Sequence, residues 1–401
     1  MIAVLPLLAT AGAATGDENR GIELIVGTTA LRDDNLYRLP EGVSPPEAGL
    51  PSDRRADRLL GPYVEARVGM EQAGQSFGLR SRVSRDIFDD NDAYDANRLD
   101  AAATWQGQFT QRWRTELQYA FEQRVTSFAD FRNPERNILD LRTLRGSLSF
   151  RPRPDTRLSA HATDYRGSNS VTARQTSDYR IRVVRLEAAR SGALGNEVAL
   201  GASRTDGAFP NRALVGSAPV DNSYQQEDID LTLVWRPGEA TSALLRGGRA
   251  TRRFETVGER NFAGPTWTAQ LSWQPTGRLA LRTGFVRDLN AVDDFDRLYA
   301  VTRVQRASLV YALSSKLTAG IEVSRQRTDY RGDPSNFLTR LIGQRPARAD
   351  RAEEQRVTLA WAPRDRWRVN AGYSRLTRRS NLSTLDFDAN LTQLGLEYRA
   401  F

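Results

Sequence analysis

Apolar and polar residues alternate along most of this chain. Residues 229–235 are a clear case, because every second position is apolar: Ile229, Leu231, Leu233 and Trp235. The same alternation recurs at 267–273, 317–323 and 367–373. A period of two over seven residues predicts a β-strand with one apolar and one polar face. Because such strands follow one another along most of the chain, we predict a transmembrane antiparallel β-barrel.

Two kinds of connection separate the predicted strands. Short ones rich in Pro, Gly, Ser and Asp, such as 236–238 and 274–277, alternate with long polar ones, such as 205–226 and 327–352. Turn chemistry of this kind, with short connections at one end and long ones at the other, is typical of outer-membrane barrels. The count predicts an all-β, up-and-down barrel of about 18 strands, with 16 as the alternative because three strands are weakly patterned.

The composition suits a barrel better than a helical membrane protein. Only 39% of the 401 residues are hydrophobic, and no run approaches the ~18 apolar residues that a spanning helix needs. A barrel tolerates this polarity because only every second strand residue faces lipid. The chain has no cysteine, which is compatible with an oxidising periplasm.

The first residues resemble the end of a signal peptide. An apolar run over 2–9 leads to the small residues Ala11, Gly12 and Ala13, which suit a cleavage site. We predict a signal-peptide remnant at 1–14 and a single outer-membrane barrel over 15–401. The basic segment that normally precedes the apolar run is missing, so we expect the true start to lie upstream.

Tryptophan is concentrated beside the short turns, and only Trp267 lies elsewhere. Indole rings prefer the level of the lipid headgroups, so tryptophans aligned at one rim predict an aromatic girdle. The predicted girdle residues are Trp105, Trp113, Trp235, Trp273, Trp361 and Trp367.

The chain ends in an alternating strand whose last residue is aromatic. Leu394, Leu396 and Tyr398 share one face, but Phe401 follows Tyr398 by three residues and breaks the alternation by one. A terminal Phe is common in outer-membrane barrels. A β-bulge or a frayed last residue would explain the extra position.

The chain carries 57 basic residues against 49 acidic ones. Lys316 is its only lysine, so the excess is almost wholly arginine. One interpretation is a GC-rich genome, and the other is a pore lined by arginine that attracts acidic solutes. Nucleic-acid binding is not expected, because the arginines are spread over every strand and form no single patch.

Polar residues opposite the apolar faces should point into the lumen. We predict the following lumen residues: Arg80, Arg82, Gln270, Arg282, Glu322, Arg356, Arg366, Arg368 and Asn370. One hypothesis is a polar, arginine-rich path for an anionic or sugar-like solute. The alternative is that inward Arg, Glu and Asp side chains only pair with one another in ladders.

Signals for catalysis or metal binding are weak. The single histidine, His161, lies two residues from Ser159, but no Gly-x-Ser-x-Gly turn accompanies them, so we expect an ordinary lumen histidine and no enzyme. There is no Cys/His cluster for zinc. The acidic loop at 89–92 lacks the EF-hand spacing, so we expect a solvated loop, and neither a metal nor a cofactor.

One short motif resembles a known family. The motif consists of Asp33, Asp34, Asn35, Leu36, Tyr37, Arg38, Leu39 and Pro40. It resembles a segment of the EpsL-type exopolysaccharide-biosynthesis outer-membrane proteins, a β-barrel porin family associated with exosortase. Its Asp and Asn side chains can close a loop through bonds to the backbone, and Leu36, Tyr37 and Leu39 would then tuck into the barrel mouth.

The resemblance implies an outer-membrane pore that takes part in exopolysaccharide export, with no catalytic residues. The implied partners are outer-membrane lipid, the barrel-assembly machinery, an exopolysaccharide or other sugar or anionic solute, and periplasmic export proteins. Two alternatives stay open: a non-conducting docking barrel of an export complex, and a general diffusion porin for small anionic solutes.

Overall fold

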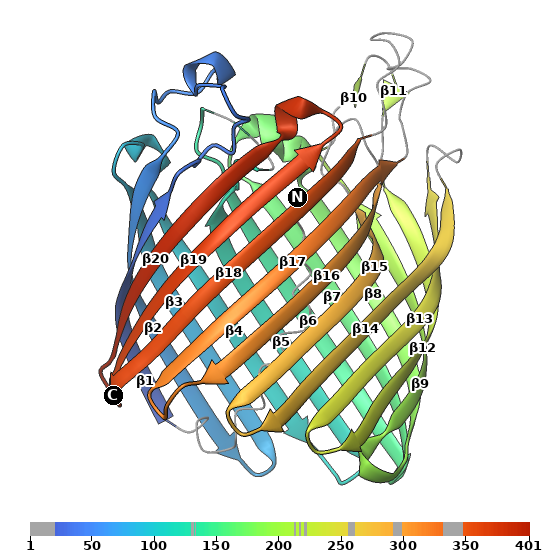
Figure 1. The fold of residues 1–401 in the computed structure, drawn as a ribbon. Helices are drawn as coiled ribbons and strands as arrows, with labels where there is room; N and C mark the ends of the chain where they lie inside the picture. The colour runs from blue at the N-terminus through green and yellow to red at the C-terminus, as the bar shows by residue number, and fades with distance from the viewer. Residues whose placement is uncertain are drawn as a thin grey trace.

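The computed structural model describes residues 21–129, 132, 134–211, 214–215, 218–219, 223–255, 261–291, 299–331 and 348–401. The predicted signal-peptide remnant at 1–14 lies outside these residues. Eighteen long strands form one antiparallel sheet, which closes because β1 pairs with both β2 and β20. The prediction of an up-and-down barrel of 18 strands is confirmed, and the alternative of 16 is wrong (Figure 1).

The strands run in chain order around the wall. Their bounds are β1 Gly21–Asp33, β2 Asp57–Gln72, β3 Gln75–Phe88, β4 Ala96–Gln108, β5 Trp113–Val125, β6 Ile138–Arg153, β7 Thr156–Asn169, β8 Tyr179–Ser191, β9 Glu197–Ala208, β12 Tyr224–Gly238, β13 Thr241–Phe254, β14 Phe262–Thr276, β15 Leu279–Ala291, β16 Tyr299–Ala312, β17 Leu317–Arg331, β18 Ala349–Arg364, β19 Trp367–Ser380 and β20 Phe387–Arg399. Two short strands, β10 Leu214–Val215 and β11 Ala218–Pro219, pair separately within the connection from β9 to β12.

Several strands are longer than the alternation alone predicts. The sequence alone predicts a second strand near 62–69, but β2 spans Asp57–Gln72, and its pairing with β1 extends to Asp33 opposite Asp57. Ladder hydrogen bonds continue where the side chains are polar on both faces, so hydropathy underestimates the length. A membrane-spanning strand needs about 9–11 residues, so these strands project beyond the apolar band.

Short 3-10 helices occupy several of the connections. They are η1 Pro46–Ala48, η2 Asp92–Tyr94, η3 Thr172–Ser177, η4 Ala193–Gly195 and η6 Ser383–Leu385. Within the described ranges, no helix has the length and the apolar character needed to cross a membrane.

The two faces of the wall differ as the alternation predicts. Outward Val64, Leu186 and Ile321 are 47%, 61% and 51% exposed, whereas inward Glu65, the neighbour of Val64, is 2% exposed. Exposed apolar side chains on every strand would be costly in water but are stable against lipid. Closure of the sheet also leaves no unpaired strand edge within the membrane.

The predicted girdle tryptophans lie on the outward face beside the short connections. Trp113, Trp235, Trp273, Trp361 and Trp367 are all at least one-third exposed. Trp105 pairs with outward Phe77 across β3 and β4, and their rings stack with centroids 6.5 Å apart. Their role as a girdle stays a prediction.

The C-terminal strand contains the extra residue that the sequence indicates. The N–H of Ala400 donates to the carbonyl of Leu24 (2.8 Å), while the N–H of Leu24 donates to the carbonyl of Phe401 (3.1 Å). One residue of β1 therefore faces two residues of the C-terminal segment, which is the pattern of a β-bulge.

Candidate solute pathway

The inward wall carries charged clusters, and the first surrounds Glu65 on β2. Its carboxylate accepts from Arg67 (2.6 Å) and Arg80 (3.0 Å), and Arg82 lies 4.0 Å away. The Arg82 guanidinium also stacks over the ring of Tyr63, 3.5 Å from its centroid. A buried carboxylate with several arginine partners is stabilised by charge-assisted hydrogen bonds.

A second cluster surrounds Asp230 on β12, which is 4% exposed. Arg185 on β8 donates to both of its oxygens (2.6 and 2.9 Å), and Arg246 on β13 donates to one (2.7 Å). Arg185 also pairs with Glu187 (3.0 Å), which in turn accepts from Arg157 (3.2 Å). Side chains from four strands, β7, β8, β12 and β13, thus form one network of paired charges, which reaches over β9 between β8 and β12.

Two further charged pairs lie on the inward faces of β16, β17 and β18. Glu322 pairs with Arg306 (3.5 Å), and Arg356 pairs with Glu354 (2.5 Å) and donates to Ser374 (3.2 Å). Arg80, Arg82, Glu322 and Arg356 thus lie within ion-pair distance of local partners, and whether they also line a solute path stays a prediction.

The remaining predicted lumen residues lie closer to the short turns. By strand alternation and register, Gln270, Arg282, Arg368 and Asn370 face inward. Arg366 does not lie on a strand, because it occupies the turn between β18 and β19, so its place is the rim. None of these three arginines has a carboxylate partner among the described residues, so their charges are not neutralised by a local ion pair.

The segment that carries the family motif is fixed by hydrogen bonds and an ion pair at the end of the barrel with the long connections. The Asp33 carboxylate accepts from the N–H of Asn35 (3.0 Å) and pairs with Arg38 (2.7 Å). The Asn35 amide donates to the carbonyl of Leu39 (2.9 Å) and to that of Asp388 on β20 (2.8 Å). These side-chain bonds to the backbone close the loop, as the residue types suggest.

Aromatic and aliphatic side chains from this loop fill part of the barrel mouth. We call the following residues the mouth cluster: Tyr37, Leu39, Leu50, Phe88, Tyr94 and Phe128. Tyr37 and Leu39 are fully buried, and the Tyr37 ring meets Phe128 edge-on with centroids 4.8 Å apart. Burial, together with neighbouring Tyr94, raises the pKa of the Tyr37 hydroxyl well above its usual range.

The acidic loop at 89–92 belongs to this packing and is not simply solvated. Asn91 is buried, accepts from the Tyr37 hydroxyl and donates to Asp57 (2.7 Å). Asp90 pairs with Arg54 (2.9 Å). The expectation of a solvated loop is therefore wrong at Asn91, because Tyr37, from the connection between β1 and β2, packs onto it.

The described residues of the connection from β5 to β6, which are 126–129, 132 and 134–137, make contacts inside the mouth, and we call them the crossing segment. Ala129 packs against Phe387 and Ala389 on β20, and Arg378 on β19 donates to its carbonyl (2.6 Å). Arg132 donates to the carbonyl of Thr384 (2.6 Å) in the connection from β19 to β20. Strands β1–β4 separate β5 from β20 along the 18-stranded wall, so these contacts span one side of the opening.

The size of the barrel shows what the crossing segment does. Eighteen strands spaced about 4.8 Å apart and tilted by about 40° enclose a wall of roughly 35 Å diameter. A chain that leaves β5, contacts β20 and returns to β6 therefore occupies part of that opening. No periodic pattern in the sequence predicts this segment, although an aromatic residue in a polar connection, Phe128, is a weak signal of it.

Arg132 on the crossing segment is a basic group without a bonded carboxylate among the described residues. It also donates to the backbone carbonyls of Tyr37 (3.3 Å) and Arg38. Burial and, secondarily, the charge of Arg378 lower its pKa to about 10. It remains charged at neutral pH, so two guanidinium groups lie near each other in the mouth.

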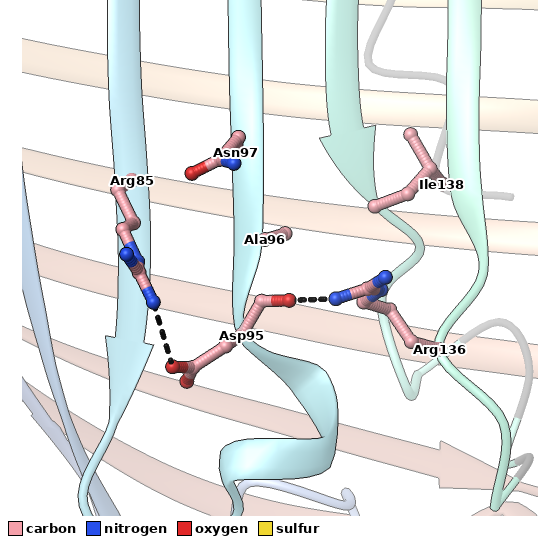
Figure 2. A pocket seen from close by; sticks show the side chains of 6 residues that line it. All are labelled: Arg85, Asp95, Ala96, Asn97, Arg136 and Ile138. Atoms are coloured by element: carbon pink, nitrogen blue, oxygen red, sulfur yellow. Dashed lines mark hydrogen bonds and ion pairs between the residues drawn. The ribbon is translucent and has the colours of Figure 1, made fainter.

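A pocket of about 380 Å³ lies on the outer surface of the barrel, at the end with the long connections and next to the crossing segment. It is lined by Arg85, Asp95, Ala96, Asn97, Arg136 and Ile138 (Figure 2). The Asp95 carboxylate lies 3.9 Å from Arg85, and Arg136 donates to the Asp95 carbonyl. Arg85 alternates with inward Ser84 and Asp86, so this pocket belongs to the outer surface and not to the lumen.

The predicted histidine and serine lie on the inward face of β7. His161 faces Ser147 on one side and Arg185 on the other, while the Ser159 hydroxyl bonds Ser149 (3.2 Å). No hydrogen bond joins His161 to Ser159 in the described part of the chain, so the pair does not form a nucleophile with its base. In those residues there is also no group of three or more His, Cys, Asp or Glu side chains that could hold a metal ion.

The fold is similar to that of solved outer-membrane porins from Pseudomonas aeruginosa. OccK2 (OpdF), solved in complex with glucuronate, is 14% identical with a TM-score of 0.52, over 96% of this chain and 99% of that one. OccK9 (OpdG) is 14% identical with a TM-score of 0.49, over 94% and 98%. The outer membrane protein OpdK is 12% identical with a TM-score of 0.48, over 94% and 98%.

No protein-family model and no curated protein matches the chain. The similarity is therefore one of fold, and the EpsL-type resemblance stays a prediction. A closed barrel with an apolar outward face and the fold of outer-membrane porins is a protein of the bacterial outer membrane.

Proposed function

We propose that this chain is a diffusion channel of the bacterial outer membrane for small anionic solutes. The observation that carries the proposal is the crossing segment, which is fastened to β19 and β20 through Ala129 and Arg132. A segment held across the opening admits small molecules and restricts large ones. The pore would then select by size at the mouth.

The distribution of charge supports anions as the solutes. Arg132 and Arg378 lie together in the mouth, and Arg282 and Arg368 face inward near the short turns without carboxylate partners among the described residues. Between these two levels, the ladders around Glu65 and Asp230 pair most charges locally. Arginines at the entrance and at the exit would raise the local concentration of anions.

The comparison with OccK2 is compatible with this solute class, because that protein was solved in complex with glucuronate. Glucuronate is a small sugar acid, so it combines the carboxylate and the hydroxyl groups that arginine-lined walls bind well. For the present chain, a sugar acid of this size is a suitable first solute to test.

Exopolysaccharide export, which the family resemblance implies, is the second candidate function. It rests on the motif over Asp33 to Pro40, whose side chains close a loop at the mouth. The crossing segment argues against it, because a polymer would have to pass the part of the opening that this segment occupies. The motif is also compatible with the other alternative, a non-conducting docking barrel of an export complex.

Ion selectivity of the refolded protein in planar bilayers tests the proposal. With a KCl gradient, we expect a reversal potential of the sign that shows chloride passing more readily than potassium. Liposome swelling should be faster with glucuronate than with neutral oligosaccharides of four or more sugars. A cation-selective pore, a pore that passes the oligosaccharides freely, or a folded barrel without conductance would contradict the proposal.

A matched pair of variants tests whether the anion preference arises at the mouth. Arg132→Gln should lower anion preference several-fold, because it removes a charge held in the opening. Arg136→Gln removes the same charge four residues later, where the guanidinium lies at the outer rim (Figure 2). The second variant should keep the selectivity of the unmodified channel.

A further inference from the structure

Five arginines stand side by side on the outward face of five adjacent strands. The register pairs Arg287 on β15 with Arg303 on β16, Arg303 with Arg327 on β17, Arg327 with Arg351 on β18, and Arg351 with Arg379 on β19. We call these five residues the arginine row. Directly opposite side chains have Cβ atoms about 4.5–5.5 Å apart, and like charges at that spacing repel.

The arginine row points away from the lumen. Arg327 shares its face with Ile321 and Val323, which are 51% and 37% exposed on the outward side. The Arg303 and Arg379 side chains are 44% and 56% exposed. Anything that binds these guanidinium groups must therefore come from outside the barrel.

Protein carboxylates neutralise only part of this charge. Asp329 accepts from Arg303 (3.1 Å) and Arg327 (3.2 Å), and Asp388 pairs with Arg379 (2.6 Å). Arg287 and Arg351 have no carboxylate partner in the described part of the chain. Counted over the described residues, five positive charges against two paired carboxylates leave the row with an excess of three.

The middle of the row lies at the height of the second membrane surface, and because the strands are tilted by ~40° the row slopes through that level by about 3 Å per strand. On β17 the outward residues are apolar from Leu317, beside the short turn, up to Val323, and arginine follows. Ten positions separate Leu317 from Arg327, which is about 33 Å along the strand at ~3.3 Å per residue and about 25 Å along the membrane normal at a tilt of ~40°. An outer-membrane barrel has an apolar band of about that height, so Arg327 lies at headgroup level in the leaflet on the side of the long connections.

We propose that the arginine row binds phosphate-bearing lipid headgroups of that leaflet. Phosphate oxygens accept bidentate hydrogen bonds from guanidinium groups, and a row spaced by about 5 Å presents several such donors to one headgroup or to adjacent ones. Lipid phosphates would supply the negative charge that the row lacks. Free phosphate offers the same chemistry without an acyl chain, and the experiment separates the two sources.

Native mass spectrometry of the detergent-solubilised barrel tests the proposal with two glycolipids. One is bisphosphorylated lipid A, and the other is the same lipid after enzymatic removal of its phosphates. We expect the phosphorylated form to bind at least about tenfold more tightly, because several arginines add to the attraction. Inorganic phosphate at the same concentration should not displace it.

The triple variant R303Q/R327Q/R351Q should lose most of the preference for the phosphorylated lipid. R327Q alone should show a smaller loss in the same direction, which keeps the test informative if the triple variant does not fold. The matched control R112Q/R278Q/R364Q removes three exposed arginines at the short-turn end and should bind as the unmodified protein does.

Three results would overturn the proposal. They are equal binding of the two lipids, equal loss in the control and row variants, and displacement of the lipid by inorganic phosphate, which would indicate a site for a soluble anion.

Discussion

Arginine occupies both faces of this barrel, but its partners differ between them. On the inward wall, Asp230 holds Arg185 and Arg246, and Glu65 holds a further set of arginines, so positive and negative groups alternate from strand to strand. On the outward face, arginine stands next to arginine across five strands. The inward clusters around Asp230 and Glu65 contain their own counter-charges, whereas the arginine row takes part of them from the surroundings.

This difference shows that the partners of a charged residue depend on its position in the barrel and not only on its residue type. Arg325 and Arg327 have outward side chains on β17, and Glu322 has an inward one, although they are five residues apart at most. Alternation assigns each to a face, and only the register reveals its neighbours. The composition of the chain, with its excess of arginine, is the same whichever partners the side chains find.

The largest expected effect follows from removing the inward counter-charge at Asp230. Asp230→Ala should lower the free energy of unfolding by about 3 kcal/mol, because it leaves Arg185 and Arg246 without the carboxylate they share. Urea titration of the barrel in lipid vesicles, followed by tryptophan fluorescence, measures the change.

An outward carboxylate provides the control for that measurement. Asp206 on β9 is half-exposed and lies 3.6 Å from Arg204. Because exposed ion pairs contribute little, Asp206→Ala should change the free energy of unfolding by less than about 1 kcal/mol. Equal losses in the two variants would show that the inward ladder is no more important than a surface pair.

A second, smaller effect is expected where the crossing segment joins the mouth cluster. Phe128→Ala should cost about 2–3 kcal/mol locally, because it removes an aromatic side chain packed against Tyr37 and Tyr94. Release of the segment should then raise single-channel conductance and weaken size selection in liposome swelling. Phe109→Ala, in a short turn and 60% exposed, should leave conductance unchanged. Unchanged conductance in Phe128→Ala would show that the segment does not limit passage.

Most of the wall could be predicted from the sequence, because its physics is local. Alternation over 317–323 and 367–373 identifies β17 and β19 and their lipid-facing sides, and short turns with Pro, Gly or Asp give the hairpin order. The ends of the strands could not be predicted as well. Ladder hydrogen bonds extend β2 to Asp57 and Gln72, where hydropathy no longer alternates.

The mouth could not be predicted in the same way, because it depends on contacts between distant residues. The bond from Arg378 to the Ala129 carbonyl joins positions 249 residues apart, and no periodic pattern marks either of them. Alternation placed Arg80 and Arg82 correctly on the inward face, but it could not show that Glu65 would be their partner. Register between strands determines such pairs, and it follows from turn geometry more than from polarity.

The smallest effect is expected for Arg351→Gln, and its contrast with Arg185→Gln tests the difference between the two faces most directly. Arg351→Gln in the row should be neutral or should stabilise the barrel by up to about 0.5 kcal/mol in lipid without phosphate-rich headgroups, because it relieves repulsion from Arg327 and Arg379. Arg185→Gln should destabilise it under the same conditions, because Asp230 and Glu187 lose a partner. In vesicles that contain phosphorylated lipid, the sign for Arg351→Gln should reverse, since the row then has its counter-charges. Urea titration in both kinds of vesicle measures the four values. If Arg351→Gln destabilises the barrel equally in both, lipid phosphate is not the partner of the row, and the contrast between the two faces would need another cause.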